Sequence, residues 1–506
     1  MSSHNHNQSP PKDPNIPSNN ASNKNRLSRY GRLPTFEEVR KRRLSADAAL
    51  RKMQREQLIT AKRFRHTRET MALGEDDDSE FFLTAGEVEQ LKNNMQSPSQ
   101  ETRMEAMRQL TKYLVDPPDT LKEFVINGEC VDILTKYLKG MDPEEQLQAT
   151  WCITNIAAGS PELSTKALST VPYLITLLQG ENNGLQDQAA WAIGNMAVEG
   201  DEFRDVLRAN GVLIPLINLL KSTDLQLVQT ACFALSNLAR GANPRLDDFF
   251  DAGISELLFQ HLAKDEAGEV ISEVSWVLTY LTCKNEQNIL RLIREGLVPL
   301  LVKCMPRMVD RGALAIPLIR TLGNIASGPD EFDDELLKEP QFLPLLLKYI
   351  QSECRSVKKE SLWVMSNITA ARRAETLSKV IDAGFVPVLS SIVAHTNFDL
   401  RKEAAFSLVN IASHGPEHVQ LLPHNDLLPV FLDFVRGGDP EMIQLGLTYI
   451  QLLLTHVPEG KQLIESIQGI EALESLSVME DPQLRHVAGG LMDMYFGEQV
   501  EDTEVA

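Results

Sequence analysis

Residues 186–199 read QDQAAWAIGNMAVE, and similar phrases recur along the chain as ATWCITNIAAG, ACFALSNLARG, VSWVLTYLTCK, LIRTLGNIASG, SLWVMSNITAA and AAFSLVNIASH. The phrases align on Asn155, Asn195, Asn237, Tyr280, Asn324, Asn367 and Asn410, with steps of 40, 42, 43, 44, 43 and 43 residues. Self-similarity at a nearly fixed period is the signature of a repeat architecture. The chain is therefore predicted to be an array of short repeats.

A second phrase recurs between these echoes, as INGECVDILTKYL, RANGVLIPLINLL, DAGISELLFQHL, REGLVPLLVKCM and DAGFVPVLSSIV. In each, a Gly ends one helix and an apolar helix follows, often with Pro near its start. A period of ~40–47 residues with two or three helices per repeat is typical of HEAT and armadillo arrays. We predict an all-α fold, an armadillo-repeat right-handed α-solenoid of about ten repeats over residues 87–496, preceded by a flexible basic N-terminal arm.

The charge of the chain is unevenly distributed. Of 506 residues 43% are hydrophobic and 24% charged, which indicates a globular protein with net charge −20. Residues 26–68 carry 14 Lys+Arg and 4 Asp+Glu, a net of +10, residues 1–25 carry +1, and the remaining 438 residues carry −31. An acidic body repels phosphate backbones, which argues against nucleic acid and favours a basic partner or peptide. The arm is the nearest such peptide.

The ends of the chain differ from the array. Residues 1–25 are Asn, Ser, Pro and His with few bulky apolar side chains, so we expect a disordered polar tail, in which His4 and His6 are solvated rather than metal ligands. Residues 26–70 form a basic segment rich in helix formers. Residues 71–86 are an acidic linker, and residues 497–506 an acidic C-terminal tail. The basic segment is interpreted either as a solvated helix or as one that folds on an acidic partner.

Motifs that the sequence lacks limit the activity and the cellular compartment that we expect for the protein. The six Cys are far apart with no CxxC pair, which favours reduced, buried thiols in an intracellular protein. No apolar run approaches the ~20 residues of a membrane span, and the N-terminus has no secretory signal pattern. We find no P-loop, nucleophile elbow, HExxH motif or His/Cys/Asp cluster. We therefore expect that the protein is not an enzyme and that it binds no cofactor and no metal.

The helix over 186–199 carries two distinct faces. Ala190, Ile193 and Ala197 form an apolar face, whereas Trp191 and Asn195 share another face with two more polar residues. The polar face comprises Gln188, Trp191, Asn195 and Glu199, and it recurs as Glu273, Trp276 and Tyr280, as Glu360, Trp363 and Asn367, and as Glu403, Phe406 and Asn410. A single Trp is ordinarily explained by core packing. Because similar polar residues accompany the aromatic residue in several repeats, this face is better explained as a binding surface.

Each position on that face suits an extended basic peptide. An Asn side chain has one acceptor and two donors, which match the C=O and N–H groups of an extended backbone. Indole rings form slots for the aliphatic stems of Lys or Arg and attract the cation. Carboxylates hold the charged heads. In an armadillo stack this helix lines the concave surface, so the sequence predicts a groove that binds a basic peptide.

The pattern is interrupted once. Tyr280 replaces an Asn, and Arg320 stands where a Trp would be, four residues before Asn324. A cation there would repel a basic peptide and divide the groove into two pockets. The first is centred on Trp151, Asn155, Trp191, Asn195, Phe233 and Asn237, and the second on Trp363, Asn367, Phe406 and Asn410. Four repeats span ~40 Å, so the ligand would have two basic clusters joined by a linker of roughly a dozen residues.

From about Arg26 to the C-terminus the chain resembles the importin-α (karyopherin-α) family. The resemblance rests on the WxxxN array in register, on TNIAAGS, LSNLARGANP, KKESLWVMSNITA and RKEAAFSLVNIAS, and on the arm RKRRLSADAALRKMQREQLITAKRF. It implies an adaptor that binds mono- and bipartite nuclear localisation signals of cargo proteins and shuttles between cytoplasm and nucleus through the pore. The arm would bind importin-β and, when free, occupy the groove as an autoinhibitor. GGLMDMYFGEQVEDTE is similar to the segment that binds the nuclear export receptor.

The resemblance also implies site residues, carried over by motif. The major site would comprise Trp151, Asn155, Gly159, Gln188, Trp191, Asn195, Glu199, Phe233, Asn237, Glu273 and Trp276. The minor site would comprise Tyr280, Arg320, Asn324, Asp330, Glu360, Trp363, Asn367, Glu403, Phe406 and Asn410. The importin-β-binding residues would be Arg40, Lys41, Arg42, Arg43, Arg51, Lys52, Arg55, Lys62 and Arg63.

The sequence departs from the family pattern in several places. Phe233 and Phe406 replace the usual Trp, which gives less cation–π attraction, and Glu199 replaces the usual Asp. The first repeat, near 104–138, is poorly patterned, and LITAKRFRHTR departs from the usual basic run. The alternative to a transport adaptor is an armadillo scaffold for signalling, adhesion or the cytoskeleton, which would share the fold without the arm and the acidic rims.

Overall fold

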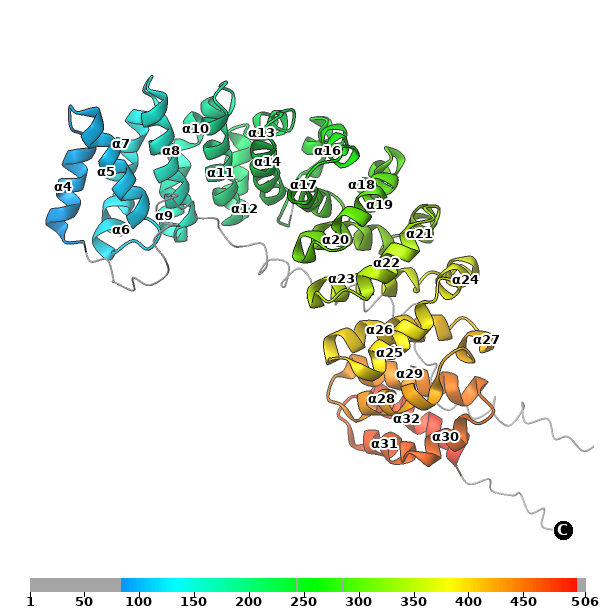
Figure 1. Cartoon of the computed structure of the whole chain (residues 1–506). Coiled ribbons are helices and arrows are strands. Elements are labelled where there is room, and N and C mark those ends of the chain that lie inside the picture. The colour runs from blue at the N-terminus through cyan, green and yellow to red at the C-terminus, as the bar shows by residue number, and fades with distance from the viewer. Residues whose placement is uncertain (1–82, 243, 284, 498–506) are drawn as a thin grey trace, which may run out of the picture. The chain divides into compact units, whose positions relative to one another are not determined.

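The computed structural model describes residues 83–242, 244–283 and 285–497, and every regular element within these ranges is a helix (Figure 1). These residues belong to two compact units, of which one includes 83–383 and the other 384–497. The arm 26–70, the tail 1–25, most of the linker 71–86 and almost all of the C-terminal tail 497–506 lie outside the described residues.

The unit that includes 83–383 is a succession of three-helix repeats. It opens with α4 (Ala85–Met95). The third helices of its repeats are α5 (Gln100–Tyr113), α8 (Pro143–Ala158), α11 (Asn183–Val198), α14 (Leu225–Leu238), α17 (Gly268–Leu281), α20 (Ile316–Ala326) and α23 (Arg355–Ile368). The first helices are α6 (Asp119–Ile126), α9 (Pro161–Ala167), α12 (Asp201–Ala209), α15 (Leu246–Asp251), α18 (Glu286–Arg294), α21 (Asp330–Leu337) and α24 (Ala374–Asp382). The second are α7 (Glu129–Leu138), α10 (Val171–Leu178), α13 (Leu213–Leu219), α16 (Ile254–Ala263), α19 (Leu297–Met308) and α22 (Phe342–Ile350), with 3₁₀ turns η1 (Leu168–Thr170) and η2 (Gly312–Ala315).

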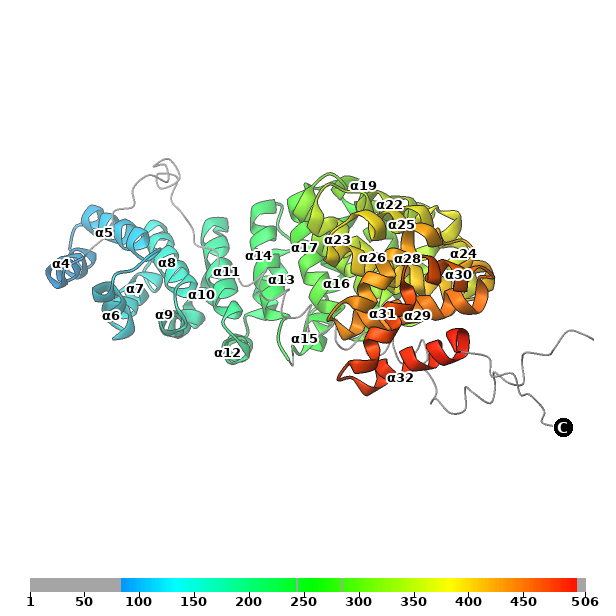
Figure 2. The same ribbon diagram turned by 90° about the horizontal axis from the view of Figure 1, so that it is seen from below.

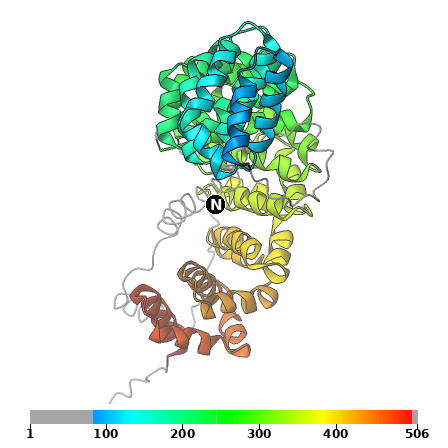
Figure 3. The same ribbon diagram turned by 90° about the vertical axis from the view of Figure 1, so that its left-hand side faces the viewer.

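The unit that includes 384–497 continues the same helix order. It contains α25 (Phe385–His395), α26 (Phe398–Ala412), α27 (Pro416–Val419), α28 (His424–Arg436), α29 (Pro440–His456), α30 (Gly460–Ser466), α31 (Gly469–Ser475), η3 (Leu476–Val478), α32 (Pro482–Leu491) and a π-helix, η4 (Met492–Phe496). Figure 3 shows these helices, coloured yellow to red, stacked in successive layers. In their core the Tyr449 ring stacks on Phe431 with centroids 4.0 Å apart.

The predicted helix stops are confirmed. The Gly of each second phrase adopts a left-handed conformation, with φ of +93° at Gly128 and +97° at Gly296, and it separates a first helix from the apolar second helix. Only Gly enters this region without a steric penalty from Cβ. The chain therefore turns between first and second helices where the sequence predicted.

The array begins slightly earlier than predicted. Thr84 caps α4, accepting a hydrogen bond from the Glu87 N–H, while the Glu87 carboxylate accepts one from the Thr84 N–H at 2.8 Å. This reciprocal capping box fixes Ala85 as the first helical residue. Residues 85 and 86, assigned to the acidic linker from composition, belong to the first helix.

The third helices form the spine of the unit that includes 83–383. Neighbouring helices α8, α11, α14 and α17 contact one another in sequence and lie side by side in two perpendicular views (Figures 1 and 2). Their side chains are largely buried, including Cys152, whose thiol pKa burial raises to about 12. All six Cys are free, as predicted, but Cys283 and Cys354 are only half-buried because they lie at helix ends.

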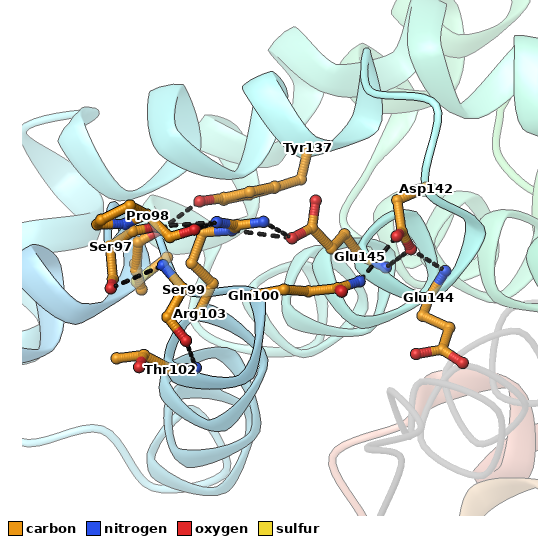
Figure 4. A network of polar contacts seen from close by, with 11 residues as sticks. Ser97, Pro98, Ser99, Gln100, Thr102, Arg103, Tyr137, Asp142, Glu144 and Glu145 are labelled. Carbon is orange, nitrogen blue, oxygen red and sulfur yellow. Dashed lines mark hydrogen bonds and ion pairs between the residues drawn. The ribbon is translucent and has the colours of Figure 1, made fainter.

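The first repeat is held by a polar network that its weak hydrophobic pattern did not reveal (Figure 4). Arg103 on α5 donates from Nε to the Glu145 carboxylate of α8 at 2.8 Å. Its Nη1 donates to the backbone carbonyls of Ser97 and Pro98, both at 2.9 Å. One guanidinium thus joins the α4–α5 turn to the next repeat, because it donates both to backbone carbonyls of the turn and to a carboxylate of α8.

Candidate functional site: a stapled ladder on the third helices

We call the recurring polar face of the third helices the ladder. The Asn residues of the ladder join successive third helices. Asn195 Nδ2 donates to the carbonyl of Thr154 on α8 at 3.2 Å, and Asn237 Nδ2 donates to the carbonyl of Gly194 on α11 at 3.3 Å. The same bond occurs from Asn155 to Thr111 (3.0 Å), from Asn324 to Thr279 (3.0 Å) and from Asn367 to Gly323 (3.2 Å). Each acceptor lies one residue before the ladder position of the preceding repeat. We call these bonds the Asn staples.

The Asn staples show that the ladder Asn residues hold neighbouring helices together, a structural role that we did not predict from the sequence. The ladder Asn residues are buried, and a buried amide requires hydrogen-bond partners. An Asn amide has two N–H groups and one acceptor oxygen, so a staple uses only part of its capacity. The recurrence of Asn once per repeat fits a structural bond as well as peptide recognition. The sequence alone offered no way to separate the two.

The aromatic side chains lie against the neighbouring third helix. Phe233 seats its ring on Gly194, where an added Cβ would lie 2.6 Å from Cε1, and Trp363 covers Gly323 in the same way. The Gly at these positions therefore makes room for a ring of the next repeat. The six aromatic side chains divide by exposure: Trp151, Trp191 and Trp276 are half-buried, whereas Phe233, Trp363 and Phe406 are buried.

Arg320 has partners within the protein. Its Nη2 lies 2.8 Å from Glu360 Oε1, and its guanidinium carbon lies 5.6 Å from the Trp276 ring centroid. Only 7% of the Arg320 side chain and 17% of the Glu360 side chain are exposed. The carboxylate expected to hold a cargo cation therefore holds Arg320, and Arg320 lies over one of the rings expected to form a slot.

Arg240 also belongs to the site, although we did not predict it from the sequence. Its Nη1 donates to Asn237 Oδ1 at 3.2 Å, and its guanidinium lies 6.0 Å from the centroid of Tyr280. The residue lies three positions after Asn237, one helical turn along the same face. Its position in LSNLARG could have shown this, because every i+3 residue after a ladder Asn faces the same side.

The predicted polar residues differ in exposure and in partners. Gln188 and Glu403 are buried, whereas Glu199 and Glu273 are half-buried. Asp330 accepts the Arg372 backbone N–H at 3.0 Å, which ties the first helix of one repeat to the loop that follows the next third helix. Gly159 ends α8.

The structure brings most of the predicted residues into one row. The major-site residues and Tyr280, Arg320, Asn324, Glu360, Trp363 and Asn367 lie on α8 to α23 or at their ends, within one unit. Glu403, Phe406 and Asn410 lie on α26, in the unit that includes 384–497. The arm residues Arg40 to Arg43, Arg51, Lys52, Arg55, Lys62 and Arg63 lie outside the described residues.

Two further observations concern metals and membranes. Among the described residues no group of three or more His, Cys, Asp or Glu side chains is arranged to hold a metal ion. Taken singly, none of the described helices combines the length and apolarity of a membrane span, while the bent pair α24 and α25 meets the criteria by length and composition only.

Three-helix repeats with stapled third helices define an armadillo-repeat protein, as predicted. A family model described as TMCO6 matches residues 88–496. Importin subunit alpha-9 of Arabidopsis thaliana is 32% identical over 437 residues, covering 81% of this chain and 83% of the relative. Importin subunit alpha-2 of Oryza sativa subsp. japonica is 33% identical over 440 residues, covering 82% and 83%. The crystal structure of an engineered protein matches with a TM-score of 0.71 at 27% identity, covering 82% of this chain and 99% of that one.

The chain therefore belongs to the importin-α family and to the family described as TMCO6, and it is an importin-α-like adaptor. This confirms the family resemblance and the all-α armadillo fold predicted from the sequence.

Proposed function

We propose that this adaptor binds basic nuclear localisation signals along the ladder of its third helices and links them to importin-β through residues 26–70. The observation that carries the proposal is the register of the ladder. Half-buried Trp151 and Trp191 lie on successive helices that the Asn195 staple joins, and the half-buried carboxylates of Glu199 and Glu273 lie at the end of α11 and on α17. This combination of rings, amides and carboxylates suits an extended chain of Lys and Arg.

The register sets the spacing of the ligand. Packed helices lie ~8–10 Å apart and an extended peptide advances ~3.3–3.6 Å per residue, so one repeat serves about three residues. The Lys or Arg stem enters between neighbouring rings, and the carboxylates receive its charged head. Arg320 with its Glu360 partner separates the stretch around Trp191 from the residues around Trp363. A ligand with two basic clusters fits this division.

The proposed cycle follows from the opposite charges of the arm and the body. The arm competes with cargo for the acidic groove, and importin-β relieves that competition by taking the arm. Release of importin-β in the nucleus restores the competition, and a nuclear export receptor then binds the C-terminal region. The adaptor would thus shuttle between cytoplasm and nucleus.

The test is a titration of a fluorescent two-cluster basic peptide against the full chain and a truncation that begins at Met71, at low and physiological salt. We expect tight binding by the truncation and weaker binding by the full chain. Equal binding would retain the cargo site and remove autoinhibition. If neither protein binds, the adaptor proposal fails and the scaffold alternative takes its place.

A variant pair locates the site without disturbing the fold. Asn195→Ala would break a staple as well as a peptide contact, so its effect on binding could not be interpreted alone. Glu199→Gln with Glu273→Gln keeps side-chain size and removes two charges from the groove. We expect weaker peptide binding and a shallower salt dependence. The control is Glu256→Gln, an exposed charge on the second helix α16, which should leave binding unchanged.

A further inference from the structure

A cavity of about 480 Å³ lies between two neighbouring repeats of the unit that includes 83–383. Its lining residues belong to the first and second helices α15, α16, α18 and α19 or to the turns at their ends, and no ladder residue is among them. Ligand sites in proteins commonly have volumes of about 300–1,000 Å³. We call this cavity the α16–α18 pocket.

The α16–α18 pocket combines apolar side chains with a mouth that is open to solvent. Phe250 of α15, Phe259 of α16 and Leu300 of α19 line it. Gly253 and Ala263, at the two ends of α16, also line it and are exposed. Small-molecule sites usually enclose most of the ligand surface. An open, apolar pocket is better suited to a side chain that another protein presents from its own backbone.

One cation borders the pocket, and it is held against an aromatic ring. The guanidinium carbon of Arg291 lies 4.7 Å from the centroid of the Phe250 ring, and Arg291 Nε donates to Glu295 Oε1 at 3.0 Å. Nevertheless, 46% of the Arg291 side chain is exposed. A second ring can therefore stack on the exposed side of the guanidinium, because ring faces attract cations and guanidinium groups stack on aromatic faces.

The charges around Arg291 select an uncharged ring. A carboxylate or phosphate that entered the pocket would have to compete with Glu295 for the guanidinium, and a Lys or Arg side chain would be repelled by it. A neutral aromatic ring leaves the ion pair of Arg291 with Glu295 in place and adds a cation–π contact. The pocket thus differs in chemistry from the acidic groove of the third helices.

A buried hydroxyl supports the view that the pocket is incomplete without a ligand. Ser255 of α16 lines the pocket and is only 8% exposed, and its Oγ has no hydrogen-bond partner within the described part of the chain. A buried polar group without a partner costs free energy. Rotation about the Cα–Cβ bond would let this hydroxyl bond to a polar group of a ligand.

We propose that the α16–α18 pocket is a second binding site, which accepts an uncharged aromatic side chain from a segment of a partner protein and stacks it on Arg291. The proposal is independent of the groove, because no ladder residue lines the pocket. The protein can therefore hold a basic peptide on its third helices and an aromatic anchor on its first and second helices at the same time.

The test titrates uncharged peptides against the full chain by saturation-transfer NMR. The probe is acetyl-Gly-Gly-Phe-Gly-Gly-amide, and matched peptides carry cyclohexylalanine or Ala in place of Phe. Burial of the ring should make the Phe peptide bind about tenfold or more tightly than the Ala peptide. Cyclohexylalanine keeps the apolar surface without the aromatic ring, so the Phe peptide should bind about two- to fivefold more tightly than the cyclohexylalanine peptide.

Three variants assign the binding to the pocket. Arg291→Leu removes the cation from an exposed position and should abolish the preference for Phe over cyclohexylalanine. Ala263→Trp places a large side chain in the pocket and should abolish binding of both peptides. The control is Arg294→Leu, which removes an exposed cation from α18 outside the pocket and should leave the preference unchanged.

Several results would overturn the proposal. Equal binding of the Phe and cyclohexylalanine peptides would exclude stacking on Arg291, and a preference that persists in Arg291→Leu would place the ring elsewhere. If free benzyl alcohol bound as tightly as the Phe peptide, the pocket would be a small-molecule site. If Phe36→Ser with Phe64→Ser in the arm raised the affinity of the Phe peptide, the occupant would be the arm of this chain. The groove proposal is tested separately, because the Phe peptide carries no charge.

Discussion

Substitution of Gly194 by Ala tests whether the aromatic side chains seat on the neighbouring helix. An added Cβ would lie 2.6 Å from Phe233 Cε1, 2.7 Å from Cδ1 and 3.3 Å from the Cα of Ala234. Phe233 is buried with 4% exposure, so its ring cannot swing into solvent without losing its packing. Inserting a methyl group into such a contact costs about 1–3 kcal/mol.

The cost is offset in part by helix propensity, and a control separates the two contributions. Replacing Gly by Ala inside a helix gains about 1 kcal/mol. Gly489 lies inside α32 with no heavy atom within 4 Å of the added Cβ, so Gly489→Ala should show the gain alone. Relative to that control, Gly194→Ala should be less favourable by about 1–3 kcal/mol.

Native-state hydrogen exchange measures both effects locally, through the opening free energies of peptides that cover α11 and α32. A second variant, Phe233→Leu, shortens the ring and should remove most of the penalty of Gly194→Ala, so the two changes should be non-additive. If Gly194→Ala stabilises α11 as much as Gly489→Ala stabilises α32, the ring does not seat on Gly194. Additive effects would contradict the contact in the same way.

Two further predictions concern charged contacts. Glu360→Gln should destabilise the unit that includes 83–383 by up to about 3 kcal/mol in urea unfolding, because the buried Arg320 loses its charged partner; an effect near zero would show that the pair is solvated. The Arg204 guanidinium lowers the pKa of Asp201 below its usual 3.8, and Asp201 also accepts the Ala242 N–H. Because the pKa of Asp201 is lower in the folded state than in the unfolded state, its charge stabilises the fold above the unfolded-state pKa, and this stabilisation is lost as the pH falls through the folded-state pKa. Hydrogen exchange at the Ala242 amide should therefore increase below about pH 4. Asp201→Asn should abolish that pH dependence, and a pH dependence that persists in this variant would belong to another group.

The fold could be predicted from the sequence because its determinants are local. The Gly between first and second helices adopts a positive φ, which only a residue without Cβ reaches without a steric penalty. This requirement concerns a single residue, so Gly128 could be recognised from the sequence. The spacing of Asn195, Asn237 and their counterparts gave the period because each repeat must present the same face to its neighbour. The start of α4 was misplaced because its capping box, Thr84 with Glu87, lies at the edge of an acidic run.

The partners within the site could not be predicted, because they lie some 40 residues away in the chain. Arg320 was recognised from the sequence as a departure from the repeat pattern, but its ion pair with Glu360 depends on how α20 packs on α23. The Asn staples depend on a backbone carbonyl, which every residue has and no pattern distinguishes. The contact between α5 and α8 was missed for the same reason, since only the bond from Asn155 to the carbonyl of Thr111 shows it.

The pattern of Asn staples changes at Tyr280. Tyr280 has no amide to donate, so its helix cannot make the Asn bond to the preceding helix, while the carbonyl of Thr279 still accepts from Asn324. Toward the preceding helix, the guanidinium carbon of Arg240 lies 6.0 Å from the centroid of the Tyr280 ring.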